Sequence, residues 1–230
     1  MIELRHITKT YGKKHNQFKA LNDINLTIPG GASVAILGKS GSGKSTLMHA
    51  ISGLDRPQTG QVVIDGQDIL QMKPRQVDAF RARTIGFIFQ SFFVEGGESC
   101  YDNVSLSLET AGVPRSKRKR RIVAALEAVG LEDKIKARAK NLSGGQKQRF
   151  AIAATLVNQP KVLFLDEPTN HLDIGMIEWL EKFLQSYHGG VLLISHDRYF
   201  LDRVANRILE LDHAEVTAYT GNYTHYMRVK

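Results

Sequence analysis

Residues 38–46 read Gly-Lys-Ser-Gly-Ser-Gly-Lys-Ser-Thr. This stretch follows an apolar run at 33–37 that is typical of a buried strand, and a helical pattern begins at Lys44. Closely spaced glycines let backbone N–H groups turn toward one anion, and a helix that starts there adds the positive end of its dipole. The spacing also satisfies the G-x-x-x-x-G-K-[ST] pattern. We therefore expect a polyphosphate-binding loop between a strand and a helix.

The residues of this loop have separate expected roles. Lys44 is expected to reach the β- and γ-phosphates, and the Ser45 hydroxyl is expected to ligate Mg²⁺. A glycine-rich turn with an accidental lysine is the competing interpretation, which the strand before the loop disfavours. The other nucleotide-binding candidates are Gly38, Ser40, Gly41, Ser42, Gly43 and Thr46.

Two adjacent carboxylates end a second buried strand, where residues 162–167 read Val-Leu-Phe-Leu-Asp-Glu. Ligands collect at the carboxyl edge of open α/β sheets, so Asp166 is expected to hold Mg²⁺. Glu167 is then suited to polarise an attacking water as the general base. Capping of the next element explains either carboxylate alone but is a weak explanation for both.

Strand and helix patterns alternate along the chain, which predicts an α/β fold with a mainly parallel sheet covered by helices. The opening segments 2–8 and 18–28 alternate polar and apolar residues, as the antiparallel strands of a β edge do. A nearly all-helical stretch from 101 to about 158 predicts an inserted helical lobe. The expected buried strands are 33–37, 85–89, 161–165 and 191–194, and the expected core helices are 44–52 and 173–187.

Composition excludes several classes of protein. No apolar stretch approaches the ~18 residues of a membrane helix, and the first residues do not resemble a secretory signal. The single cysteine, Cys100, cannot form an internal disulfide, which fits a reducing cytoplasm. The 31 Lys and Arg residues exceed the 23 Asp and Glu residues and give a net charge of +8, which favours phosphate-rich partners or an anionic surface.

The densest positive charge lies at 115–121, where six of seven residues are basic. Apolar residues follow at helical spacing, so the cluster is expected to open a helix whose other face packs inward. A solvated helix face is the preferred interpretation. Direct DNA binding is not expected, because no aromatic residues interleave with the charges as base stacking requires.

A further glycine-containing motif, Leu-Ser-Gly-Gly-Gln at 142–146, lies at the expected start of a helix and reads as a second anion cradle. A simple serine cap is the alternative. With the loop and the carboxylates, this motif makes the chain resemble the ABC ATPases, a class of P-loop NTPases. The resemblance implies a head-to-tail homodimer in which this cradle closes over ATP held by the opposite subunit. It assigns nucleotide contacts to Ser143, Gly144, Gly145 and Gln146.

The resemblance also assigns four isolated residues. Gln90 resembles the glutamine that senses Mg²⁺ and the attacking water, and His196 resembles the switch histidine that contacts the γ-phosphate and braces Glu167. Tyr11 resembles the aromatic residue that stacks on adenine, and Asp173 resembles an aspartate at the dimer seam. Taken alone, each has an ordinary structural explanation. The implied catalytic residues are therefore Glu167, His196, Gln90 and Lys44, and the implied Mg²⁺ ligands are Ser45, Gln90 and Asp166.

The two parts of the chain resemble different branches of this family. Residues 1 to about 155 resemble the ATPases of macrolide-export and lipoprotein-release transporters. From about residue 163, the chain resembles the ABC-F class of ribosome-acting ATPases. The motifs that carry this resemblance are Asp-Glu-Pro-Thr-Asn-His-Leu-Asp at 166–173 and Ser-His-Asp-Arg-Tyr-Phe at 195–200. A complete ABC-F factor carries two such domains and is excluded on length. We hypothesise a natural or engineered recombinant of the two branches.

These observations lead to one functional expectation with two alternatives. The chain is expected to be a single ABC ATPase domain over 1–230, with a core of 1–90 and 159–230 and a lobe of about 91–158. It is expected to couple ATP hydrolysis to a membrane permease on the cytoplasmic face of the membrane. Apolar residues suited to contact the permease, or to pack within the lobe, are Phe92, Phe93, Val94 and Tyr101. The alternatives are an ABC-F-like ribosome-associated fragment and a recombinant with no native partner.

Overall fold

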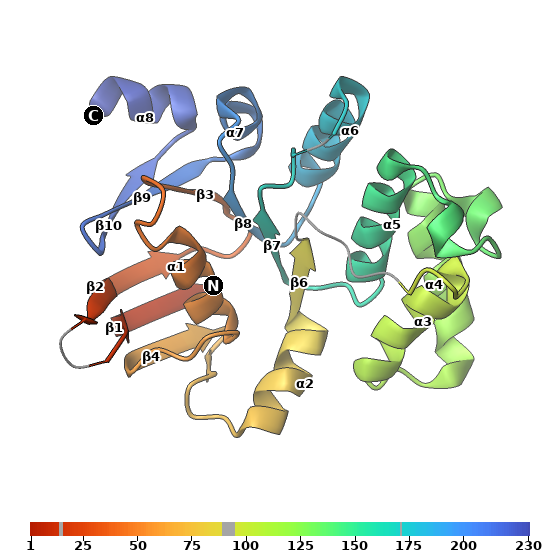
Figure 1. The fold of residues 1–230 in the computed structure, drawn as a ribbon, viewed down its shortest axis with the longest axis horizontal. Helices are drawn as coiled ribbons and strands as arrows, with labels where there is room; N and C mark the ends of the chain where they lie inside the picture. The colour runs from red at the N-terminus through yellow and green to blue at the C-terminus, as the bar shows by residue number, and fades with distance from the viewer. Residues whose placement is uncertain (14–15, 89–94, 171) are drawn as a thin grey trace.

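A six-stranded sheet runs through the centre of the computed structural model, which describes residues 1–13, 16–88, 95–170 and 172–230 (Figure 1). Neighbouring strands from β9 to β6 are parallel, and β10 pairs with β9 in the antiparallel sense. This arrangement confirms the predicted α/β class with a mainly parallel sheet. In spatial order the strands are β10 (Glu215–Thr220), β9 (Arg207–Asp212), β3 (Ser33–Leu37), β8 (Gly190–Ile194), β7 (Val162–Asp166) and β6 (Ile85–Ile88).

A second, four-stranded sheet forms the antiparallel β edge that the opening sequence predicts. β1 is its central strand and pairs with β2 on one side and β4 on the other. The expected edge is therefore a separate sheet, and it packs over one side of the parallel sheet. Its strands, in spatial order, are β2 (Phe18–Ile28), β1 (Ile2–Tyr11), β4 (Thr59–Ile64) and β5 (Gln67–Asp68).

Helices cover the sheets and also form the lobe. Figure 1 shows α3, α4 and α5 grouped beyond β6, whereas α1 lies over the sheets and α6 to α8 lie together along one edge. The core helices are α1 (Lys44–Ser52), α2 (Pro74–Thr84), α6 (Ile174–Gln185), α7 (Arg198–Val204) and α8 (Tyr223–Val229). The helical lobe contains α3 (Cys100–Thr110), α4 (Arg115–Ala128), the short turns η2 (Glu132–Lys134) and η3 (Ala139–Asn141), and α5 (Gly144–Leu156).

The parallel sheet is buried on both faces because its strands alternate between two apolar clusters. In β7, Leu163 and Leu165 join the cluster of the lobe, α6 and α7, whereas Phe164 joins the cluster of α1 and the antiparallel sheet. All three side chains are fully buried. A strand flanked by two cores needs apolar residues at every position, which is why the run at 162–165 contains no polar residue.

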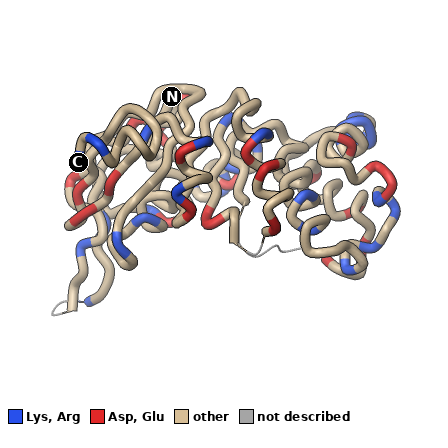
Figure 2. Tube along the Cα trace, turned by 90° about the horizontal axis from the view of Figure 1, so that it is seen from above, with Lys and Arg blue, Asp and Glu red and all other residues tan. Residues whose placement is uncertain are grey.

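The basic cluster opens α4, as its sequence predicts. Ile122 and Leu126 are fully buried and face the lobe interior, whereas Arg115 and Lys117 are exposed. Figure 2 shows Lys and Arg residues spread over the end of the molecule that the lobe forms. Arg118 pairs with Glu109 at 2.8 Å, so part of this charge is neutralised within the lobe.

None of the helices in the described part of the chain combines the length and the apolar character needed to span a bilayer.

Removal of one ring at the centre of the sheet is expected to destabilise the fold. Phe164 stacks on Phe87 with 5.2 Å between the ring centroids. We expect Phe164→Ala to lower the free energy of unfolding by about 3–5 kcal/mol, because it leaves a cavity between packed layers. Urea denaturation measures this change. Leu106→Ala, at a side chain that is 64% exposed, is the control and should cost less than about 0.5 kcal/mol.

Candidate functional site

The order of the parallel strands brings three separate stretches of sequence to one edge of the sheet. β8 lies between β3 and β7, and all three strands are parallel. Their carboxyl ends therefore lie side by side. β3 leads into the glycine-rich loop, β8 leads into Ser195 and His196, and β7 ends at Asp166 before Glu167. Residues that the sequence placed far apart thus meet at a single edge.

The glycine-rich loop adopts a backbone that only glycine can hold at two positions. Gly38 has φ +153°, and a Cβ there would lie 2.4 Å from the Leu211 carbonyl oxygen and 2.5 Å from Ser42 Oγ. Gly43 has φ +104°, and its Cβ would lie 2.7 Å from the Ala20 carbonyl oxygen. By contrast, nothing lies within 4 Å of a Cβ at Gly41. The loop is tight against the protein on one side and open at its tip.

The polar groups of the loop leave capacity for an anion. Lys44 Nζ donates to the carbonyl oxygens of Gly38 at 2.9 Å and Lys39 at 3.0 Å, so the ammonium group lies across the loop. Ser42 Oγ is buried without a hydrogen-bond partner among the described residues. α1 has no side-chain cap and no acidic residue in its first turn, which begins with Lys44, Ser45 and Thr46. A phosphate group would satisfy these donors.

Asp166 faces this loop from the end of β7. Burial raises the pKa of Asp166, and the positive charges of His49 and Lys44 oppose that effect. No cluster of three or more His, Cys, Asp or Glu side chains suited to a metal occurs in the described ranges. One carboxylate and one hydroxyl, from Asp166 and Ser45, are a donor set that fits Mg²⁺, which prefers hard oxygen ligands and takes most of the others from phosphates and water. The residues present are therefore compatible with a nucleotide–Mg²⁺ complex.

Glu167 and His196 form a pair at the same edge. His196 Nε2 lies 3.4 Å from Glu167 Oε1, and the His196 backbone N–H donates to Glu167 Oε2 at 3.3 Å. The Glu167 side chain is largely buried, with 17% exposure, whereas the imidazole of His196 is 76% exposed. The carboxylate is thus held from one side, and the histidine faces solvent where a substrate can approach.

Tyr11 lies beside the first turn of α1. Its hydroxyl donates to Asp55 Oδ2 at 2.5 Å and lies 3.5 Å from Thr46 Oγ1. Lys9 Nζ bonds the same aspartate at 2.5 Å and lies 5.1 Å from the centre of the Tyr11 ring. Sequence reasoning missed Lys9 and Asp55. The run Gly-Leu-Asp-Arg-Pro at 53–57 was the available signal, but it gives Asp55 no role without the fold.

The second glycine motif forms the start of α5. Ser143 caps this helix by accepting the Gln146 backbone N–H at 3.3 Å, and Gln146 Oε1 accepts the Ser143 backbone N–H at 3.0 Å. A Cβ at Gly145 would lie 3.4 Å from Met176 Cγ of α6, whereas nothing lies within 4 Å of one at Gly144. Asp173 caps α6 by accepting the Met176 N–H at 2.8 Å. The starts of α5 and α6 are therefore neighbours.

The two cradles do not meet within one chain. Figure 1 shows α1 and α5 on opposite sides of β6, with α5 in the lobe. Ser143 caps α5 in the lobe, whereas the loop at 38–46 leads into α1. The loop before α1 and the Ser-Gly-Gly motif at the start of α5 are thus separate features of one chain.

Several predicted residues lie outside the described part of the chain. Gln90, Phe92, Phe93 and Val94 all belong to this group. Tyr101, by contrast, is described. It is half-buried and packs against the apolar cluster of the lobe, and its backbone N–H donates to the Ile135 carbonyl at 3.0 Å. These contacts favour packing within the lobe over a role as an external contact.

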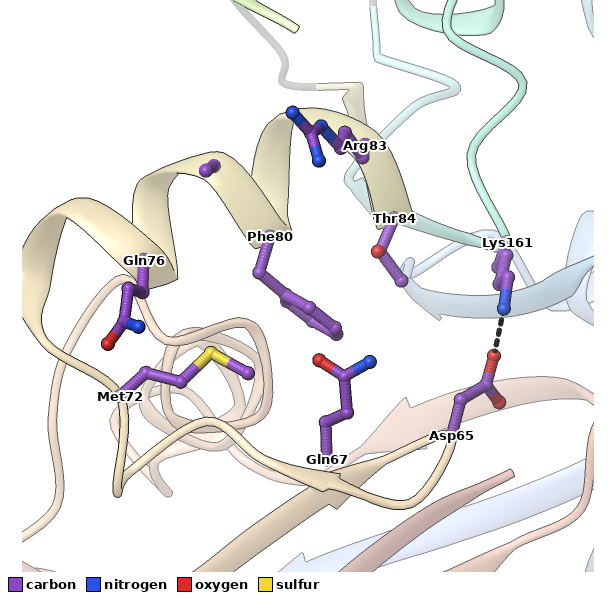
Figure 3. Close-up of a pocket in the computed structure, with 9 residues that line it drawn as sticks. Asp65, Gln67, Met72, Gln76, Phe80, Arg83, Thr84 and Lys161 are labelled. Carbon is purple, nitrogen blue, oxygen red and sulfur yellow. Dashed lines mark hydrogen bonds and ion pairs between the residues drawn. The ribbon is translucent and has the colours of Figure 1, made fainter.

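A cavity of about 390 Å³ lies at the opposite edge of the sheet, away from the predicted site (Figure 3). Phe80 and Met72 form part of its apolar lining, and Lys161 pairs with Asp65 at 2.7 Å at one end of it. The hydrogen bonds from Lys161 and the N-terminus lower the pKa of Asp65. Lys161 precedes β7, so this cavity marks the amino ends of the strands. None of the predicted site residues lines it.

Comparisons with known proteins agree with this geometry. Residues 21–170 match the family model described as ABC transporter. Methionine import ATP-binding protein MetN 2 of Enterococcus faecalis is 40% identical over 220 residues, which is 94% of this chain and 64% of that protein. Macrolide export ATP-binding/permease protein MacB of Hyphomonas neptunium is 38% identical over 225 residues, 96% of this chain and 35% of that protein. The chain thus spans less than two thirds of either relative.

Solved structures give the same result. The dimeric post-hydrolysis state of the ATP-binding cassette MJ0796, bound to ADP and Pi, superposes with a TM-score of 0.82 at 32% identity. The match covers 96% of this chain and 98% of that one. The structure of cbiO1 from Clostridium perfringens, part of a cbiONQ transporter complex, gives a TM-score of 0.82 at 28% identity and covers 99% and 90%.

The same comparisons do not support the hypothesis of a recombinant. A match that covers 94% of the chain includes both sides of the suspected junction between 155 and 163. One relative of the importer kind and one of the exporter kind each account for nearly the whole chain. The comparisons give no separate support for an ABC-F segment after residue 163.

The tightness of the loop leads to a prediction about two of its glycines. We expect Gly38→Ala to lower the free energy of unfolding by about 3 kcal/mol, since the new methyl group meets the Leu211 carbonyl. Gly41→Ala has the same problem of positive φ but no contact within 4 Å, so it should cost only about 1 kcal/mol. Chemical denaturation of both variants checks the order. Equal losses would contradict a loop packed this closely.

Proposed function

The chain belongs to the ABC transporter family and is an ATPase of the ABC type, and we propose that it drives a transporter by hydrolysing ATP as a head-to-tail dimer. The observation that carries this proposal is the Glu167–His196 pair, which lies at the same sheet edge as Lys44 and Asp166. Phosphoryl transfer to water requires a group that orients the water next to the bound phosphates, and Glu167 is placed to do this beside the loop at 38–46.

Substrate binding is assigned to the loop and its neighbours. The backbone N–H groups of 38–46 and the Lys44 ammonium hold the phosphates of ATP. Tyr11, which is 40% exposed beside α1, offers its ring to the adenine. Ser45, Asp166 and Gln90 are proposed to hold Mg²⁺, which when bound neutralises charge on the β- and γ-phosphates.

The chemical step is assigned to the buried carboxylate. Glu167 accepts a hydrogen bond from a water and orients it in line with the γ-phosphate. His196 keeps the carboxylate in place through its backbone N–H and presents its exposed imidazole to the γ-phosphate. Lys44 stabilises the charge that develops on the transferred group. This arrangement accounts for turnover without a covalent intermediate.

A second copy of the chain completes the site. Ser143, Gly144, Gly145 and Gln146 of one subunit are proposed to contact the γ-phosphate of the ATP bound by the other, with Asp173 at the seam. The separation of α1 and α5 within one chain supports this requirement. The dimeric MJ0796 cassette bound to ADP and Pi gives the precedent.

The partner is proposed to be a membrane permease, which places the chain on the cytoplasmic face of the membrane. Resemblance to macrolide-export and lipoprotein-release ATPases favours an exporter, as does the MacB relative. The MetN relatives, at up to 40% identity, favour a second candidate, a methionine importer. Expression in cells that retain the permease but lack the ATPase of each system distinguishes them: restored uptake of labelled methionine indicates the importer, and restored macrolide tolerance indicates the exporter.

Loss of the base should separate binding from hydrolysis. We expect Glu167→Gln to lower phosphate release at least ~100-fold, since an amide cannot accept the proton of the attacking water. ATP should still bind, and the variant should elute as an ATP-dependent dimer in gel filtration. The exposed Glu178→Gln of α6 is the matched control and should retain wild-type turnover.

Protein concentration provides the test of the dimer. Turnover per chain should rise with concentration when two chains form the active unit. A turnover per chain that does not change with protein concentration, together with a Glu167→Gln variant that stays monomeric with ATP, would refute the two-chain site. Stimulation of turnover by 70S ribosomes but not by a permease would instead support the ABC-F-like alternative.

A further inference from the structure

A glutamine of α5 extends from the helical lobe into the core. Gln148 is only 4% exposed, although its side chain carries an amide. Buried amides need hydrogen-bond partners, and Gln148 Nε2 donates to the Pro168 carbonyl oxygen at 3.4 Å. Pro168 directly follows Glu167. The helix that begins with Ser143 is thereby joined to the peptide that carries the proposed general base.

The backbone at Glu167 requires external support. Glu167 has φ 49°, which is uncommon for a residue with a side chain, and the following proline disfavours helical values. Such conformations persist where the surrounding structure over-determines them. Two contacts from different elements do so here. The Glu167 N–H donates to the Ile194 carbonyl at 2.8 Å, and Gln148 holds the next carbonyl oxygen.

The same loop is connected to the residues around His196. Thr169 Oγ1 lies 3.5 Å from Ser195 Oγ, and both side chains are buried. Ser195 Oγ also accepts the Asp197 N–H at 3.1 Å. A movement of the Pro168 peptide would therefore reach both members of the Glu167–His196 pair. Gln148 is the member of this network that comes from the lobe.

We propose that Gln148 is a positioning residue, which transmits the placement of α5 to Glu167 through the Pro168 carbonyl. This inference rests on the proposed function. When Ser143 at the start of α5 meets the phosphate held by a second copy, the helix is fixed, and Gln148 then fixes the carboxylate. Hydrolysis would thus depend on contact between the subunits as well as on bound ATP.

The test replaces the amide without removing its bulk. Gln148→Met keeps a similar length and volume but has no donor. We expect kcat for ATP hydrolysis to fall ~10-fold while KM changes less than ~2-fold, because misplacing the base affects the transition state and not ATP binding. In a Glu167→Gln background, Gln148→Met should cause no further loss, since a residue acting through Glu167 has nothing left to position.

Gln185→Met is the matched control. Gln185 is also a helical glutamine, and its Nε2 donates to the Arg203 carbonyl at 3.0 Å, away from the site. It should retain wild-type kcat. A second variant, Gln148→Glu, serves if the methionine variant does not fold. Its carboxyl group can donate to the Pro168 carbonyl only when protonated, so kcat relative to wild type should rise as pH falls from ~9 to ~6.

The outcomes are distinct. Wild-type kcat in Gln148→Met, a loss that adds to that of Glu167→Gln, or a Gln148→Glu to wild-type ratio that does not change with pH each overturn the role of Gln148. A wild-type chain that releases no phosphate at any concentration overturns the proposed function itself, and the inference falls with it. Turnover by the wild type with an unaffected Gln148→Met removes the inference alone.

Discussion

The parallel pairing of β3, β8 and β7 is the constraint on which the rest of the site depends. Each strand ends in a short stretch with little chemistry of its own: a glycine loop, a serine and histidine, and two carboxylates. Parallel pairing puts all three ends at one edge, and the two apolar clusters prevent the strands from shifting. A slip of one residue in β7 would turn Leu163 and Leu165 to the wrong core, so the register that places Asp166 is fixed by hydrophobic burial.

The carboxyl edge of the sheet contains a poorly solvated carboxyl group and several residues with uncommon backbone conformations. Asp166 is half-buried, desolvation raises its pKa, and the charges of His49 and Lys44 oppose this effect. Gly38 and Gly43 hold backbone conformations that exclude side chains, and Glu167 holds one that is uncommon for a residue with a side chain. A bound polyphosphate would supply the acceptors that the loop donors lack, but its negative charge would oppose ionisation of Asp166, so a cation such as Mg²⁺ between the two is needed to offset that repulsion.

Much of this was predictable from sequence, because the strongest signals are local. The strand at 33–37 and the helix at 44–52 were predicted with their observed bounds, since one apolar run and one glycine cluster determine both. The pairing of Glu167 with His196 needed the family resemblance, as strand order is not encoded by either motif. Gln148, Asp55 and Lys9 were missed. Their importance comes from contacts across 20 or more residues, and a polar residue in a helix or strand carries no local sign of such contacts.

The start of α5, with Ser143 and Gly144, already has its capping hydrogen bonds in the single chain. Ser143 accepts the Gln146 N–H and so completes the cap of α5 before any ligand arrives. A hydroxyl can accept and donate at once, so this cap leaves its own hydrogen available. Gly144 has no neighbour within 4 Å of a Cβ, and the first N–H groups of a helix have no partner within the helix itself. The start of α5 is therefore capped and open in the single chain, as the proposed contact with a phosphate requires. In Figure 1 this helix and α1 lie on opposite sides of β6, and in the proposed dimer a second chain would bring its own α5 to the phosphate loop.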